Sequence, residues 1–172
     1  MTLQPPVKTF LTFLQKNLSI RQQIRAAPNR TLLYAGHFIR PMWQEITDMK
    51  RSSPQAADKE TLPDVLARVS LQGQPFPTLL AWINDLDKLQ PWSENGFIAW
   101  RALSGIFASN AIGTVSFQVG SRVDRSKVFA VTELAVLSRN PHTDAMTRDM
   151  LAYFEQCVRS KNAGINFGFL SG

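Results

Sequence analysis

The chain of 172 residues has few of the features that fix a fold or a function by covalent or metal bonds. Cys157 is the single cysteine, so an internal disulfide is impossible and a reducing compartment is favoured. His37 and His142 have no metal-ligand spacing with the cysteine or with each other, so we expect no metal site. No phosphate-binding loop, dinucleotide-binding glycine motif or Gly-x-Ser-x-Gly elbow is present, so we expect no cofactor.

Long hydrophobic runs are also missing. The longest uncharged stretch, Ala102 to Ser121, is interrupted by three glycines and contains Ser, Thr, Asn and Gln side chains, which is too polar for a transmembrane helix. The content of 44% hydrophobic and 19% charged residues is typical of a soluble globular protein. We therefore expect one cytoplasmic, monomeric domain over residues 1–172 with its own hydrophobic core.

Acidic residues are absent from the first 44 positions, although the whole chain has a net charge of +6. A basic segment without acids is typical of an organellar targeting peptide, of a surface for nucleic acid or anionic membranes, or of a domain with a small anionic ligand. The alternative without function is a solvated basic helix face. No nucleic-acid motif accompanies these cations, so we do not expect a nucleic-acid or membrane partner.

Hydrophobic periodicity predicts an α+β fold, with an antiparallel sheet of hairpins and helices packed on one side. Residues 65–71 and 78–83 are expected to form one hairpin around Gly73, although a helix beginning near Pro63 is an alternative. Residues 51–61 are expected to be a polar loop. The predicted helices cover 7–26 (with a break at Asn17 and a second short helix capped by Ser19), 85–90, 97–110 and 146–158; the other predicted strands cover 31–39, 114–119 and 127–138.

Glu133 lies in the middle of the most apolar run of the chain, Lys127 to Ser138. Both faces of a strand over this run would be apolar, which indicates a central strand covered on both sides. A buried carboxylate has to be paired, protonated or used in chemistry, because an isolated buried charge is very costly. An ion pair with an arginine, or a strand end that reaches solvent, would explain Glu133 without any catalytic role.

Four segments in order resemble the chorismate pyruvate-lyase family and the related ligand-binding domains of bacterial regulators. The resemblance covers residues 13–140 and leaves 141–172 as a C-terminal helical extension. Because it begins inside the acid-free segment, we expect that segment to belong to the domain. The four segments are Phe13 to Arg25, Thr31 to Pro41, Leu66 to Pro77 and Ser126 to Leu137.

The resemblance implies a cofactor-independent lyase that converts chorismate to 4-hydroxybenzoate and pyruvate, as in ubiquinone biosynthesis. It implies catalytic roles for Glu133 and for Arg68, the arginine that would bind a substrate carboxylate. A small anionic aromatic or dienyl acid would be the ligand. Three further residues would then help to bind that substrate: Tyr34, Arg122 and Arg125. The two arginines suit this role because arginine holds carboxylates with two parallel hydrogen bonds.

Two departures from the family pattern keep other functions open. The family's Pro-Leu-Gly sequence is replaced by Ala102-Leu-Ser-Gly105, and Ala81-Trp82 stands where Ala-Arg is usual. One alternative is therefore a non-catalytic small-acid-binding or assembly protein on the same fold. A second alternative is a basic surface protein that binds nucleic acid or anionic membrane.

Overall fold

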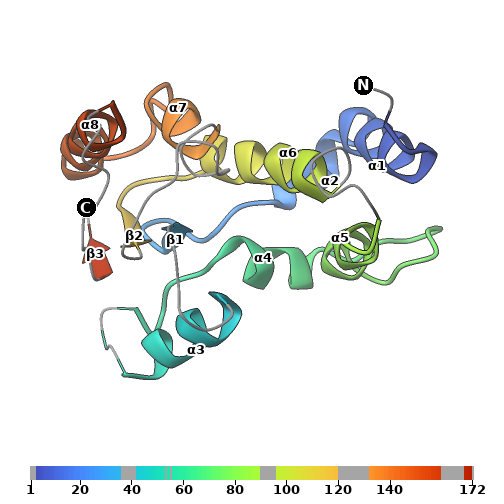
Figure 1. Ribbon diagram of the computed structural model, residues 1–172, viewed down its shortest axis with the longest axis horizontal. Helices are drawn as coiled ribbons and strands as arrows, with labels where there is room; N and C mark the ends of the chain where they lie inside the picture. The colour runs from blue at the N-terminus through green and yellow to red at the C-terminus, as the bar shows by residue number, and fades with distance from the viewer. Residues whose placement is uncertain are drawn as a thin grey trace.

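Helices form most of the computed structural model, and they surround one small sheet (Figure 1). The structure describes residues 3–35, 42–52, 54, 56–89, 96–119, 132–159 and 169–171. No helix within these ranges is both long and apolar enough to cross a membrane. The helices are α1 (Pro5–Lys16), α2 (Leu18–Gln23), α3 (Met42–Ser52), α4 (Leu62–Arg68), α5 (Leu79–Leu86), α6 (Gly96–Ser109), α7 (Leu134–Leu137) and α8 (Ala145–Arg159); the strands are β1 (Thr31–Ala35), β2 (Val115–Val119) and β3 (Phe169–Ser171).

The sheet has the order β1-β2-β3, and its two longer strands run parallel. Thr31 lies opposite Val115, and Ala35 lies opposite Val119. β3 pairs antiparallel with β2, with Phe169 opposite Gln118. A mixed α and β fold is therefore confirmed, as are strands at 31–35 and 115–119. The prediction that antiparallel hairpins build the sheet is wrong for β1 and β2, because a parallel pair needs a long crossover, and α3 to α6 supply it.

The hairpin predicted over residues 65–83 is wrong, because α4 and α5 occupy it. Thr61 and Asp64 form a reciprocal capping box at the start of α4, and Pro63 occupies its first turn. Thr78 caps α5 by accepting a hydrogen bond from the Ala81 N–H at 3.2 Å. Only an isolated antiparallel bridge between Ser70 and Thr78 remains of the pairing. The helix that could begin near Pro63 was the better interpretation.

The N-terminal helix pair and its break at Asn17 are confirmed, although the cap of the second helix is Asn17, two positions before the predicted Ser19. The Asn17 side chain donates to the Phe13 carbonyl at 2.7 Å and ends α1, and α2 begins directly at Leu18. Helices at 96–109 and 145–159 are also confirmed. Helix α3, at residues 42–52, is not predicted from the sequence.

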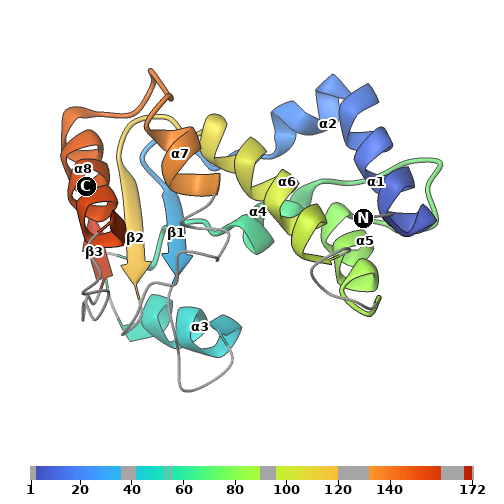
Figure 2. The same cartoon turned by 45° about the horizontal axis from the view of Figure 1, so that its top comes forward.

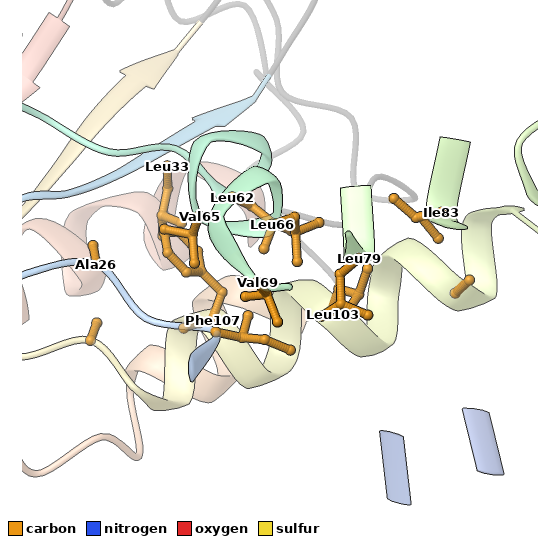
Figure 3. Close-up of a cluster of buried hydrophobic side chains, with 14 of the residues drawn as sticks. Ala26, Leu33, Leu62, Val65, Leu66, Val69, Leu79, Ile83, Leu103 and Phe107 are labelled. Carbon is orange, nitrogen blue, oxygen red and sulfur yellow. The ribbon is translucent and has the colours of Figure 1, made fainter. Parts of the chain in front are cut away.

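Helix α6 is the centre of the core, and it contacts α1, α4, α5 and α7. Figure 2 shows the sheet and α8 at one end of α6 and α1, α2 and α5 around the other. Its buried side chains Leu103 and Phe107 meet α4, α5 and β1 in one apolar cluster (Figure 3). The labelled members of that cluster are Ala26, Leu33, Leu62, Val65, Leu66, Val69, Leu79, Ile83, Leu103 and Phe107. The opposite side of α6, next to α7, is not covered by this cluster, and a surface site can form there.

Candidate functional site

Glu133 lies in a helical turn and not in the predicted strand. Thr132 and Glu133 form a wide π-type turn that leads directly into α7, while residues 127–131 lie outside the described ranges. Leu134 and Leu137 are the buried residues of α7, and they are spaced as one face of a helix. A short run that is apolar throughout fits a covered strand and a buried helix equally, and here packing against α6 selects the helix.

The carboxyl group of Glu133 is buried, and the hydroxyl of Ser104 on α6 hydrogen-bonds to it. Its second oxygen, Oε2, has no hydrogen-bond partner in the described structure. Burial raises the pKa of Glu133 from 4.5 to about 8, and the Ser104 hydrogen bond opposes this shift only in part. Glu133 is therefore a neutral, protonated acid at pH 7. Among the described residues no Lys or Arg pairs with it, so the ion-pair interpretation is not supported there.

A groove of about 690 Å³ runs along the surface between α6, α7 and the middle of α1. Its floor and walls are small or aliphatic side chains, and two arginines are the charged side chains among the described residues that line it. Thr132 lines it, but its neighbour Glu133 does not, because that side chain turns inward to Ser104. The lining residues are Leu11, Ile98, Arg101, Ala102, Gly105, Ile106, Ser109, Thr132, Ala135, Val136 and Arg139.

Gly105 allows α7 to approach α6 closely at the middle of the groove. A Cβ atom at this position would lie 3.3 Å from Cγ2 of Thr132, which is tighter than an ordinary van der Waals contact. The close approach brings Thr132 within reach of α6, where its Oγ1 accepts a hydrogen bond from Nε of Arg101 at 2.9 Å. Gly105 therefore positions the hydroxyl that orients Arg101.

The two arginines of the groove stand near opposite ends of it. Arg101 uses Nε to hold Thr132, which leaves its two terminal nitrogens without a partner among the described residues. Arg139 lies at the other end, because its neighbour Asn140 donates to the Ser109 carbonyl at 3.2 Å. Arg101 and Ser109 are two turns apart on α6, or about 12 Å. The groove thus offers two separated cations over an apolar floor.

The structure describes the side chains of only two of the predicted site residues, Glu133 and Arg68, and these two are not in one site. Arg68 ends α4, is exposed and forms an ion pair with Glu60, so it does not pair with Glu133. In Figure 1, α4 and α7 lie on opposite sides of α6. Tyr34 lies in β1 opposite Gln118, and the structure describes its backbone but not its side chain. Arg122 and Arg125 also lie outside the described residues.

Four residues in or next to the groove are not predicted from the sequence: Arg101, Arg139, Thr132 and Ser104. Arg101 is the only charged residue in α6, which is a signal that could have been found. The spacing of Ala102, Gly105 and Ser109 also marks one small-residue face of that helix. Arg139 carries no comparable signal, because only folding brings it to this groove.

The described residues do not assemble a metal site, since no group of three or more His, Cys, Asp or Glu side chains occurs within them. The chemistry that the groove offers is recognition of anions by guanidinium groups, next to a carboxylic acid that keeps its proton at neutral pH. Comparisons with protein-family models, curated proteins and solved structures found no match for this chain.

Proposed function

We propose that this protein binds a small organic acid with two anionic groups in the groove between α6 and α7. The observation that carries the proposal is the pair of arginines, Arg101 and Arg139, at the two ends of an apolar floor. Neither guanidinium has an acidic partner among the described residues. Two carboxylates separated by a flat hydrocarbon body would pair with these cations and cover Ala102 and Gly105 between them.

Chorismate is the first ligand to test, because it is a dienyl dianion and because the sequence resembles a family that acts on it. The proposed ligand class is therefore the small aromatic or dienyl acid that the sequence predicts. We propose binding first and turnover only second. The reason is that Arg68, the residue that the resemblance assigns to the substrate carboxylate, is paired with Glu60 on another side of the molecule.

The binding test compares a dianionic aromatic acid, terephthalate, and chorismate with the monoanion benzoate by calorimetry. We expect the dianions to bind more tightly, and Arg101→Ala and Arg139→Ala each to weaken them about tenfold or more, because each removes a charge-assisted hydrogen bond. Arg51→Ala is the matched control, since Arg51 is exposed on α3. Equal binding of benzoate, or equal loss in the control, would contradict the proposal.

Turnover of chorismate is the second candidate function, and the protonated state of Glu133 favours it. Cleavage of the C–O bond between the ring and the enolpyruvyl group, with loss of a proton from the ring carbon that carries the hydroxyl, aromatises the ring to 4-hydroxybenzoate. The departing enolpyruvate takes up one proton and becomes pyruvate. A carboxylic acid with a raised pKa can supply such a proton, and Glu133 directly follows Thr132, which lines the groove. In a cell the product would serve the synthesis of a quinone such as ubiquinone in the cytoplasm.

The turnover test follows 4-hydroxybenzoate and pyruvate after addition of chorismate. We expect Glu133→Gln to lower the rate at least about a hundredfold, because general acid catalysis contributes this much, and Arg68→Ala to leave it unchanged. Rates equal to the uncatalysed reaction would exclude the lyase and leave the binding proposal intact.

A further inference from the structure

One group of neighbouring elements in the described structure is basic and carries no exposed carboxylate of its own. It consists of α1, α2, α6 and the turn with α7, and we call it the basic face. These elements contact one another in the pairs α1 with α2, α1 with α6, and α6 with α7, and they lie in a row along the top of Figure 1. The cations of the basic face are Lys8, Lys16, Arg21, Arg101 and Arg139.

The only acid in these elements is Glu133, which is buried and protonated. None of the five cations forms an ion pair within the described residues. The acids of the crossover, such as Asp64 and Asp85, lie instead on α4 and α5. The basic face therefore carries a net positive charge, although the Asp87 carboxylate reaches α6 by accepting a hydrogen bond from Nε1 of Trp100 at 2.7 Å. A positive surface is expected where a protein meets a polyanion.

An exposed leucine stands among these cations. Leu18 begins α2 between Lys16 and Arg21, and 57% of its surface is exposed. Arg21 extends back to the last carbonyls of α1, including that of Leu14 at 2.9 Å, so the cations and Leu18 belong to one folded corner. An exposed apolar side chain between basic residues suits the boundary between lipid head groups and acyl chains.

We infer that the basic face docks on an anionic membrane surface through its cations and Leu18. The groove that the face contains has aliphatic walls from Leu11, Ile98 and Val136 and no aromatic lining residue among the described positions. Single-stranded nucleic acid is held by aromatic side chains on which its bases stack, so this lining favours lipid over nucleic acid.

The test measures co-sedimentation of the protein with phosphatidylcholine vesicles that contain or lack phosphatidylglycerol. We expect binding to the anionic vesicles only, and its loss at high salt, because exposed charges are screened. The double variant Lys8→Glu with Lys16→Glu should bind at least about tenfold more weakly, since each basic residue near an anionic surface contributes to the attraction. Leu18→Ser should weaken binding further without changing its salt dependence.

The matched control reverses the same number of charges elsewhere, with Arg51→Glu on α3 and Lys88→Glu after α5. It should bind anionic vesicles nearly as the parent protein does. Equal losses in the two double variants, or equal binding to neutral vesicles, would overturn the inference. Tighter binding to a single-stranded oligonucleotide than to anionic vesicles would also overturn it. Small-acid binding should survive Lys8→Glu with Lys16→Glu, because neither residue lines the groove.

Discussion

At the scale of single residues, Glu133 links the site to stability. Below pH 4.5 its carboxyl group is protonated in the folded and unfolded states, so pH has no effect through it. Between pH 4.5 and about 8 the unfolded state loses the proton while the folded state keeps it, so the free energy of unfolding falls. At pH 7 the loss is about 3 kcal/mol, and above pH 8 it stops growing.

The Glu133→Gln variant tests this cost directly. Because glutamine does not ionise, we expect its free energy of unfolding to fall by about 3 kcal/mol less than that of the parent protein between pH 5 and pH 8. Urea unfolding at several pH values measures both curves. The exposed Asp58, changed to Asn, is the control and should follow the parent curve. Parallel curves for Glu133→Gln and the parent would show that Glu133 is already ionised at pH 7.

At the scale of elements, Asn140 holds the C-terminal end of α6 against the segment that follows α7. Its buried Nδ2 donates to the carbonyls of Ala108, Ser109 and Ala111 at 3.0, 3.2 and 2.9 Å. Its Oδ1 accepts from the His142 N–H at 2.8 Å. Carbonyls at the end of a helix have no partners within the helix, so one side chain completes this terminus and fixes the position of Arg139.

Replacing Asn140 by Ala should lower the free energy of unfolding by about 2–3 kcal/mol, because buried carbonyls lose their donor. Asn140→Asp should cost more at neutral pH, since a carboxylate would face those carbonyl oxygens. Urea unfolding measures both changes. Asn84→Ala, at an exposed position of α5, is the control and should change stability by less than about 0.5 kcal/mol. A loss no larger than that of the control would show that water replaces the asparagine.

At the scale of the whole molecule, α6 joins the sheet end to the end that holds α1 and α5. Phe107 is 1% exposed and lies with Leu33 of β1 and Val69, which follows α4, in one cluster (Figure 3). These contacts come from segments that are distant in the sequence, and the parallel pairing of β1 with β2 is equally non-local. The fold therefore depends on α6 more than on any local hairpin.

Truncation of this centre should be costly. We expect Phe107→Ala to lower the free energy of unfolding by about 3–5 kcal/mol, because a buried aromatic ring leaves a cavity. Phe107→Leu should cost less, since it fills part of the same volume. Leu18→Ala serves as the exposed control, with a change within about 0.5 kcal/mol. Chemical denaturation of the three variants checks the order, and a Phe107→Ala loss as small as that of Leu18→Ala would contradict it.

The parts of the fold that the sequence predicts correctly are those with a long or clean hydrophobic period. The helices α1, α6 and α8 each run for 12 residues or more, and β2 alternates strictly. The errors fall on residues 65–83 and 132–137, where short apolar runs satisfy the strand and helix periods alike, and on α3, which is not predicted. The sequence did contain helix-capping residues in or just before the first of these segments. Thr61 caps α4 and Thr78 caps α5, and both caps favour helices over a hairpin.

The sequence by itself determined the single cysteine, the acid-free N-terminal segment and the presence of a carboxyl group in an apolar run. It therefore favoured a buried Glu133, because both faces of that run are apolar, but it left open a strand end that reaches solvent. Only the tertiary structure decided that Glu133 faces Ser104 and that Arg101 and Arg139 share a groove. The reason is that these contacts join α6 to α7 across a long stretch of chain, and no local pattern encodes such a meeting.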